Sequence, residues 1–286
     1  MTNKTIKKKI PIALDKDSAT PLYQVTDWQG RHYEYDGSDR KSVTSATKNN
    51  LRSIGLEKWK DRQVKERMRE FIGTTLDEAT VEDILGAANR EGNEAADLGT
   101  QMHEIIERLL TDRNATHLIT DQLEPAVRAW LKWRKKHMDW KLIGTEMGIY
   151  GETADGQLYA GQLDALFRKR DGTYVVVDWK TSTDLYEENY MQVATYAHAL
   201  WNMPWRDHDT WLYVSYSGLI GRVSVEAMIV RLDNEKGEDG SKVFTEECEY
   251  RYVDVPWWYG KFEHLLAAVG PNGKGMWSKN PKKVTL

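Results

Sequence analysis

Two short segments of the chain hold acidic and basic side chains of the types that can bind a metal ion and polarise a phosphate. The first is Gly161-Gln162-Leu163-Asp164, and the second is Asp178-Trp179-Lys180. Two carboxylates repel each other at short range unless a cation or a proton lies between them. Carboxylate oxygens that leave positions for water suit Mg²⁺ or Mn²⁺. A lysine beside such an ion can orient or deprotonate a water molecule or neutralise charge on a phosphate, so the pattern indicates metal-assisted chemistry.

Cooperation between the two carboxylates depends on the register of the hairpin that carries them, because a one-residue slip moves alternate side chains to opposite faces. A three-residue loop over 170–172, with its glycine in the left-handed conformation, pairs Lys169 with Thr173 and sets Asp164 opposite Asp178. The same register gathers apolar side chains on the other face: Leu163, Ala165, Phe167, Val175, Val177 and Trp179. A two-residue Asp-Gly turn would separate the carboxylates. We therefore predict the three-residue loop, which brings directly opposed β-carbons within about 5 Å.

The elements that must position these residues are predicted from hydrophobic periodicity and residue type. Residues 42–138 carry apolar side chains at helical intervals among charges and are predicted to be mostly helical. After about residue 140 the pattern becomes short and rich in β-branched and aromatic residues. The predicted strands are 142–150, 158–168, 174–180 and 211–216, with a helix over 187–201. Residues 1–41 read as an extended polar lead-in with a short hairpin at residues 28–31.

Composition excludes several classes of protein. The 286 residues are 40% hydrophobic and 29% charged, and 40 Lys+Arg against 44 Asp+Glu give a net charge of −4, which argues against a disordered chain. One cysteine, Cys248, cannot build an iron–sulfur cluster or a structural cysteine–zinc site alone. The 12 Trp against 4 Phe fit an aromatic-rich core. No stretch approaches the roughly 18 apolar residues of a membrane span, and Met1 to Ile10 lacks the apolar centre of a signal peptide.

Residues outside the two segments complete a resemblance to a known family. His103 lies upstream on a predicted helix, Glu146 lies on the strand before Gly161, and Gln192-x-x-x-Tyr196 lies on the helix that follows. With Gly161-x-x-Asp164 and Asp178-x-Lys180, this order resembles the RecB-like branch of the PD-(D/E)XK nuclease superfamily, and especially its phage and bacterial exonuclease-type members. Ser42-Val43-Thr44 and Leu56-Glu57-x-Trp59 are similar to the N-terminal helical segment of phage-type members. The chain departs from the branch in having no proline before Asp164 and Asp as its second acid.

The resemblance implies an α/β fold: a restriction-endonuclease-like core with a mixed central β-sheet flanked by helices, preceded by a largely helical N-terminal region. We expect a single nuclease domain over 1–286. Its expected parts are the lead-in and helical region 1–97, the catalytic core 98–217, and C-terminal strands and a helix over 218–286.

The resemblance also implies a role for each site residue. Asp164 and Asp178 would bind Mg²⁺ or Mn²⁺ together with the backbone carbonyl of Trp179. His103 and Glu146 would be additional metal ligands, and Lys180 would orient the attacking water. Gln192 and Tyr196 would face the scissile phosphate and the active strands. The implied activity is a DNA exonuclease that hydrolyses phosphodiester bonds by metal-activated water.

Three other functions agree less well with the sequence. His103-Glu104-Ile105-Ile106-Glu107 has Glu107 where a zinc-protease helix needs a second histidine. The segment 270–274 lacks the spacing and the hydroxyl of an ATP-binding phosphate loop, so we expect no ATP and no fused helicase. A non-catalytic nucleic-acid-binding or recombination-accessory protein of the same fold remains the alternative. The carboxylate pair disfavours that alternative, because it weakens phosphate binding when metal is absent.

The remaining expectations concern partners. The substrate is expected to be DNA, and a recombinase, a single-strand-binding protein or a separate helicase would act alongside, in the cytoplasm of a bacterium or a phage-infected host. Two basic runs could contact phosphates, although such runs are usually solvated faces. They are Lys7, Lys8 and Lys9 in the lead-in, and Lys132, Arg134, Lys135 and Lys136 at the end of a predicted helix.

Overall fold

A nine-stranded mixed sheet forms the centre of the molecule in the computed structural model, which describes residues 8–12, 22–27, 30–51, 54–203, 205–207, 212–214, 224–237 and 241–269. The strands follow the order β1-β2-β3-β4-β6-β7-β10-β11, with β5 paired to β6. Their bounds are β1 (Lys8–Ile12), β2 (Leu22–Asp27), β3 (Gly30–Tyr35), β4 (Ser38–Ser42), β5 (Lys141–Glu152), β6 (Leu158–Arg168), β7 (Tyr174–Lys180), β10 (Val225–Lys236) and β11 (Lys242–Val253). The predicted α/β fold with a mixed central sheet is confirmed.

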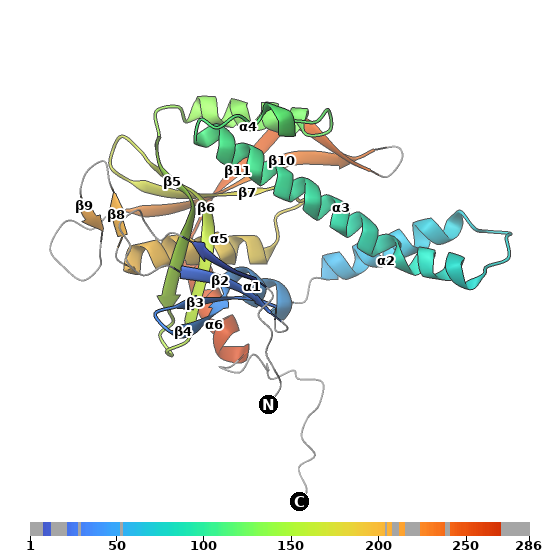
Figure 1. Cartoon of the computed structure of the whole chain (residues 1–286), viewed down its shortest axis with the longest axis horizontal. Coiled ribbons are helices and arrows are strands. Elements are labelled where there is room, and N and C mark those ends of the chain that lie inside the picture. Colours follow the sequence, from blue (N-terminus) through green and yellow to red (C-terminus); the bar gives the residue numbers. More distant parts are fainter. Residues whose placement is uncertain are drawn as a thin grey trace, which may run out of the picture.

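Helices cover both faces of this sheet (Figure 1). They are α1 (Val43–Asn50), α2 (Ile54–Arg69), α3 (Glu78–Leu110), a short 3-10 helix (Thr116–Leu118), α4 (Glu124–Lys136), α5 (Glu187–Asn202) and α6 (Val255–Val269). One core joins the sheet to α5, α1 and α6, and a second joins it to α4 and the C-terminal half of α3. The prediction that residues 42–138 are mostly helical is supported in part: α1 to α4 lie in this stretch, and the strands β1 to β4 precede them.

The second core accounts for part of the tryptophan content. Trp133 packs edge-on against Trp179, with ring centroids 5.0 Å apart, and against Trp140 at 6.1 Å. Trp130 meets Trp179 in the same way at 6.2 Å. Edge-to-face pairs of this kind favour the quadrupoles of both rings. The aromatic-rich core is therefore confirmed for these four residues, and it holds the strand that carries Asp178 and Lys180.

The hairpin β6–β7 has the predicted register. The N–H of Lys169 donates to the carbonyl of Thr173 at 2.8 Å, and Gly172 has φ +88°. The paired residues run from Arg168↔Tyr174 to Ala165↔Val177. The next pair in this register is Asp164 with Asp178. Five of the six apolar residues predicted for one face lie in the core under α3 and α4, whereas Leu163 belongs to the core under α5.

The N-terminal lead-in contributes more to the sheet than its sequence indicates. The predicted hairpin is confirmed, since β2 and β3 pair antiparallel up to Asp27↔Gly30. Beyond it, β4 pairs parallel with β6 through Lys41↔Tyr159 and Ser42↔Ala160. The lead-in therefore extends the central sheet and feeds directly into α1, whose N-cap is the Ser42 hydroxyl.

The C-terminal part supplies the strands β10 and β11 and the helix α6. β10 runs parallel to β7 and pairs with β11 along its other edge. The strand predicted at 211–216 is described only as β9 (Leu212–Val214), which pairs with β8 (Trp205–Asp207) in a separate two-stranded sheet. The central position beside β7 thus belongs to β10.

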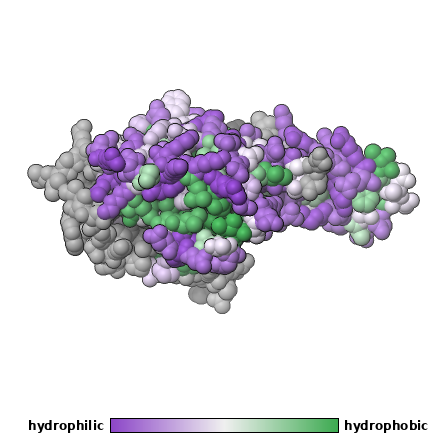
Figure 2. Space-filling view, turned by 90° about the horizontal axis from the view of Figure 1, so that it is seen from above, coloured by the Kyte–Doolittle hydropathy of each residue, from purple (hydrophilic) through white to green (hydrophobic). Residues whose placement is uncertain are grey.

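A helical arm projects from the body (Figure 1). It consists of α2 and the N-terminal half of the 33-residue helix α3, which crosses the expected boundary at residue 97 without interruption. Figure 2 shows hydrophilic side chains over most of this arm and apolar ones at its far end. Exposed Met68, Ile72 and Leu76 lie at the turn between the two helices. Within the described ranges, no helix is both long and apolar enough to cross a bilayer.

Candidate active site

The site forms where the neighbours of β6 separate. β5 pairs along the whole of one edge of β6, so β4 and β7 share the other edge. β4 pairs only with Tyr159 and Ala160, and β7 pairs only from Ala165 onward. The segment Gly161–Asp164 lies between them without a strand partner on that edge. The backbone of this segment therefore makes no ladder hydrogen bonds on that edge, and the Asp164 side chain bonds to the backbone of β7 instead.

The side chain of Asp164 bonds to the backbone of β7 just beyond the last paired residues of β6 and β7. Its Oδ2 accepts a hydrogen bond of 2.8 Å from the N–H of Trp179. Burial would raise the pKa of Asp164, but the charge of His103, a hydrogen bond from that ring and the charge of Lys180 outweigh burial and lower the pKa. This carboxylate is therefore ionised at neutral pH and fixed against the start of the Asp178-Trp179-Lys180 segment.

Asp178 is fully buried and paired with Lys180. Nζ of Lys180 lies 2.6 Å from Oδ2 of Asp178, and neither oxygen of that carboxylate accepts a hydrogen bond of ordinary geometry from the described residues. Burial raises the pKa of Asp178 to about 6, although Lys180 opposes the shift, and the charge of Asp164 adds to it. A buried carboxylate without hydrogen bonds is costly unless a cation binds it.

A chain of hydrogen bonds holds Lys180 from the helix side. Oε1 of Gln192 accepts from Nζ of Lys180 at 3.3 Å, and Nε2 of Gln192 donates to the hydroxyl of Tyr196 at 3.0 Å. That hydroxyl lies 3.2 Å from Oγ1 of Thr44 on α1. Both Gln192 and Tyr196 are buried, and burial raises the pKa of Tyr196. In this arrangement they orient the lysine.

Gly161 explains the first residue of the motif. A β-carbon at this position would lie 2.6 Å from Cε1 of Tyr196, closer than carbon atoms approach. The ring of Tyr196 therefore packs directly on the backbone of β6. The glycine is required for the close approach of α5 to the strand that carries Asp164.

His103 reaches the site from α3. Its Nε2 lies 3.0 Å from the carbonyl oxygen of Trp179, and its Nδ1 lies 3.5 Å from Oδ2 of Asp164. Burial would lower the pKa of His103, but the charge of Asp164 and the hydrogen bond to it prevail and raise the pKa. Both ring nitrogens face acceptors, so the doubly protonated ring satisfies this geometry.

Glu146 lies on β5 between Thr145 and Met147, which pair with Ala165 and Leu163 on either side of Asp164. Its φ of +51° is in the left-handed region, which is uncommon for a residue other than glycine and concentrates at functional sites. Burial and then the charge of Asp164 raise the pKa of Glu146 to about 8. Glu146 therefore shares the electrostatic environment of Asp164.

One candidate that sequence reasoning missed is Lys48 on α1. Thr44 and Lys48 are four residues apart, so they share the helix face that meets Tyr196. Lys48 is exposed overall, yet desolvation of its ammonium group and then the charges of Lys180 and Arg31 lower its pKa. The sequence feature that could have identified Lys48 is its position one helical turn after Thr44. Nothing local showed that α1 packs on α5, because that contact spans about 150 residues.

The donor atoms suit a divalent cation of the Mg²⁺ or Mn²⁺ type. Two carboxylates, Asp164 and Asp178, and the carbonyl oxygen of Trp179 are hard oxygen ligands. The oxygens of Asp178 accept no hydrogen bond of ordinary geometry from the described residues, so they can bind a cation. The described part of the chain contains no group of three or more His, Cys, Asp and Glu side chains already arranged around a point. Lys180 and His103 instead hold two of these ligands. When bound, such an ion stabilises negative charge on a phosphate and acidifies water.

Comparison with known proteins agrees with this geometry. Residues 113–251 match the model of the PD-(D/E)XK nuclease superfamily. The matched part contains Glu146, Asp164, Asp178, Lys180 and the α5 pair, and it leaves His103 outside. The match indicates a nuclease, which is a phosphodiester hydrolase acting on nucleic acid, and proteins of this superfamily typically use divalent metals.

The other comparisons are more distant. A solved structure titled "Crystal structure of SSO0001" is 13% identical, with 72% of this chain and 82% of that chain covered and a TM-score of 0.27. No curated protein matches the chain.

The raised pKa values predict how metal affinity depends on pH. Glu146, with its pKa of about 8, and Asp178, with its pKa of about 6, hold protons that a cation must displace. Mn²⁺ affinity should therefore rise by at least tenfold from pH 6 to pH 8, with net proton release. Titration calorimetry in two buffers of different ionisation enthalpy measures both. Glu146→Gln should remove most of the rise above pH 7. Equal affinity at both pH values would contradict the prediction.

The same shifts set the sign of the pH effect on stability. A carboxyl group whose pKa is higher in the folded state than in the unfolded state destabilises the fold as pH rises between the two values. For Glu146 this window runs from 4.5 to about 8. The stability of the metal-free parent relative to Glu146→Gln should therefore fall between pH 5 and pH 8, and Mn²⁺ should restore it. Thermal unfolding of the parent and of Glu146→Gln checks this.

Proposed function

We propose that the protein is a divalent-metal-dependent deoxyribonuclease, acting as an exonuclease, that hydrolyses phosphodiester bonds with metal-activated water. The observation that carries the proposal is the buried Asp178 carboxylate, which pairs with the Lys180 ammonium at 2.6 Å and lies within the electrostatic reach of a second carboxylate, Asp164. This arrangement is unfavourable without a cation and useful with one. The match of residues 113–251 to a nuclease superfamily supports the same chemistry.

In this proposal Lys180 acts as a donor. Burial would lower the pKa of Lys180, but the carboxylates of Asp178 and Asp164 outweigh burial and raise it. The side chain is therefore an ammonium group at neutral pH. It can orient a water molecule or neutralise charge on a phosphate, and its raised pKa disfavours a role as the base. Gln192 and Tyr196 are positioning residues, because they bind the lysine and each other.

Metal ligation is proposed for Asp164, Asp178 and the carbonyl of Trp179, with His103 and Glu146 as further ligands. The ring of His103 lies beside two of the proposed ligands, and it would bind the ion after losing one of its two N–H protons. The exonuclease mode rests on the resemblance of the motif set to phage-type exonucleases. We further propose that a separate helicase, recombinase or single-strand-binding protein acts alongside the enzyme, in the cytoplasm of a bacterium or phage-infected host.

A digestion assay tests the proposal. The purified protein is incubated with Mg²⁺ or Mn²⁺ and end-labelled linear duplex, covalently closed circular duplex or single-stranded DNA. We expect mononucleotides or short fragments from linear DNA, an intact circle, and no products in EDTA. Cleavage of the circle would refute the exonuclease mode. Binding of DNA without cleavage under any metal would refute the enzyme and favour the non-catalytic alternative.

A further inference from the structure

The arm that projects from the body carries a row of cations. α2 lies antiparallel along α3, since Cη2 of Trp59 would contact a β-carbon at Gly92 at 3.8 Å and Arg67 pairs with Asp83 at 2.7 Å. On one side of α2 the spacing of four, three and four residues aligns basic side chains along a single face. We call them the α2 cation row: Lys58, Arg62, Lys65 and Arg69.

The α2 cation row is exposed and not neutralised. All four side chains are exposed, and none makes a hydrogen bond or an ion pair with the described residues. Together with two carboxylates, Asp61 and Glu66, the row lines a shallow cavity on the surface. Glu66 is bound by Lys236 at 2.6 Å, which leaves Asp61 as the one lining carboxylate without a cation of its own.

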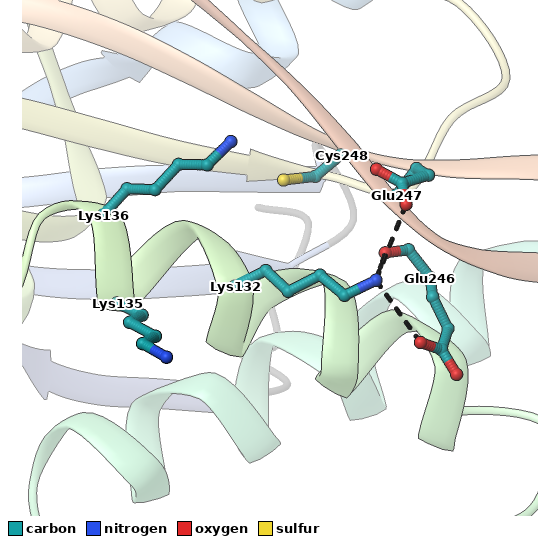
Figure 3. Close-up of a pocket in the computed structure, with 6 residues that line it drawn as sticks. All are labelled: Lys132, Lys135, Lys136, Glu246, Glu247 and Cys248. Atoms are coloured by element: carbon teal, nitrogen blue, oxygen red, sulfur yellow. Dashed lines mark hydrogen bonds and ion pairs between the residues drawn. The ribbon is translucent and has the colours of Figure 1, made fainter.

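The basic run on α4 differs in this respect. Nζ of Lys132 lies 3.3 Å from a carboxylate oxygen of Glu246 and 3.5 Å from one of Glu247, as Figure 3 shows. The Lys135 side chain lies apart from these carboxylates in the same view. Part of the α4 charge is therefore already compensated by β11. Of the two exposed basic surfaces, the α2 cation row presents more uncompensated charge to an anion.

An ion pair and a hydrogen bond connect the row to the strand that carries Asp178 and Lys180. Lys236, which binds Glu66 between Arg62 and Arg69, lies two residues after Asn234 on β10. Nδ2 of Asn234 donates to the carbonyl of Thr181 at 3.0 Å, and Thr181 directly follows Lys180. The row thus lies on the side of the arm that faces the C-terminal end of β7.

The spacing suits a nucleic-acid strand that leaves the site along the arm. From Gly92, at the level of Trp59, to His103 is eleven residues of α3, or about 16 Å. The row itself, from Lys58 to Arg69, extends about another 16 Å along α2. That length corresponds to about five base pairs at 3.4 Å each. A regular array of phosphates is the ligand whose charge and length match a regular row of cations.

We propose that the α2 cation row binds backbone phosphates of the DNA flanking the scissile bond, independently of base sequence. This inference rests on the proposed nuclease function and assigns the surface that holds its substrate. Lys58, nearest the body, would contact the phosphates closest to the active site, and Arg69 would contact the most distant ones. The arm would then determine how strongly DNA binds, while Asp164, Asp178 and Lys180 would determine how fast it is cut.

The salt dependence of DNA affinity tests the inference. Binding of a labelled 30-base-pair duplex is measured by fluorescence anisotropy in the Asp178→Asn background, so that nothing is cut. Each phosphate contact on duplex DNA contributes about 0.9 to the slope of log K against log salt. The variant K58A/R62A/K65A/R69A should lower the slope by about 3 and the affinity at 150 mM salt by at least 100-fold. The control K132A/K135A/K136A should change the slope by less than 1.

Two further measurements make the outcomes distinct. Asp61→Lys adds a cation to an exposed position of the same face, so it should tighten binding about fivefold and steepen the slope by about one. With Asp178 intact, the fourfold variant should hydrolyse bis(p-nitrophenyl) phosphate at the parent rate while digesting DNA slowly. An unchanged slope in the fourfold variant, or no gain from Asp61→Lys, would overturn the inference. If the parent protein hydrolyses neither substrate but the variants show these slope changes, the proposed nuclease function is refuted. The inference that the α2 cation row binds DNA is then still supported.

Discussion

Replacing Asp178 by asparagine should reduce metal-dependent DNA cleavage by at least a thousandfold and leave the stability of the fold nearly unchanged. Asparagine has the same shape but cannot bring a negative charge to the cation or to Lys180. The variant lacks the negative charge that would attract the cation and, through it, stabilise the transition state. Electrostatic attraction is strongest in a buried site such as this one, so the loss should be large. Single-turnover digestion of end-labelled duplex in Mn²⁺ measures the loss.

The small effect on stability follows from the pKa of Asp178. The fold raises this pKa from 3.8 to about 6, so the folded protein disfavours the ionised carboxylate even with Lys180 beside it. The resulting penalty builds as pH rises from 3.8 to about 6. A neutral side chain avoids this penalty but leaves the Lys180 ammonium without its nearest carboxylate, so the two effects offset each other. We expect the free energy of unfolding at pH 8 to change by no more than about 1 kcal/mol. Asp184→Asn, an exposed carboxylate nearby, is the control and should alter neither quantity. Wild-type cleavage by Asp178→Asn would refute the assignment of the site.

Replacing Lys180 by methionine should have two large effects. Cleavage should fall at least a hundredfold, because the ammonium group that orients water or neutralises phosphate charge is gone. The fold should also lose about 2–4 kcal/mol at pH 8, since removal of one partner leaves the buried Asp178 charge uncompensated. The two partners are therefore not equivalent: the aspartate can be neutralised with little harm to stability, and the lysine cannot.

The dependence on pH separates this explanation from simple loss of packing. At pH 5 Asp178 is largely protonated in the fold, so the destabilisation by Lys180→Met should shrink to about 1 kcal/mol. The double variant Asp178→Asn/Lys180→Met should regain most of the stability at pH 8 and none of the activity. Chemical denaturation of the parent, the two single variants and the double variant at both pH values gives the free energies of this double-mutant cycle. Equal destabilisation at pH 5 and pH 8 would show that Asp178 is not the cause.

The catalytic hairpin is the part of the structure that local sequence information predicts best. β6 and β7 have the predicted bounds, and the loop at residues 170–172 fixes the register that sets Asp164 opposite Asp178. A glycine at φ +88° and alternation of apolar side chains are short-range signals, so no distant contact is needed to interpret them. The apolar residue Leu163 is the exception, because it belongs to the core on the other side.

Features that depend on distant contacts were not predictable in the same way. β4 joins the sheet by pairing with β6 across more than 100 residues, and the sequence of the lead-in shows only a polar hairpin. Lys48 reaches the site because α1 packs on α5, and the α2 cation row is distinguished from the run on α4 by carboxylates on β11. Pairing partners far along the chain decide which charges are free. Sequence alone lists charges without showing which are compensated.

Helix α3 joins two regions of very different stability. Its inner turns contribute Met102, Ile105 and Ile106 to the core under the sheet, whereas its outer turns bury only Ile84, Ala87 and Ala88 against α2. Local opening costs less free energy where fewer apolar contacts are broken. The outer turns can therefore open and close without unfolding the body, and His103, on the inner part, keeps its place during such opening. We therefore expect the turns of α3 before Met102 to exchange their amide hydrogens faster than the turns that follow.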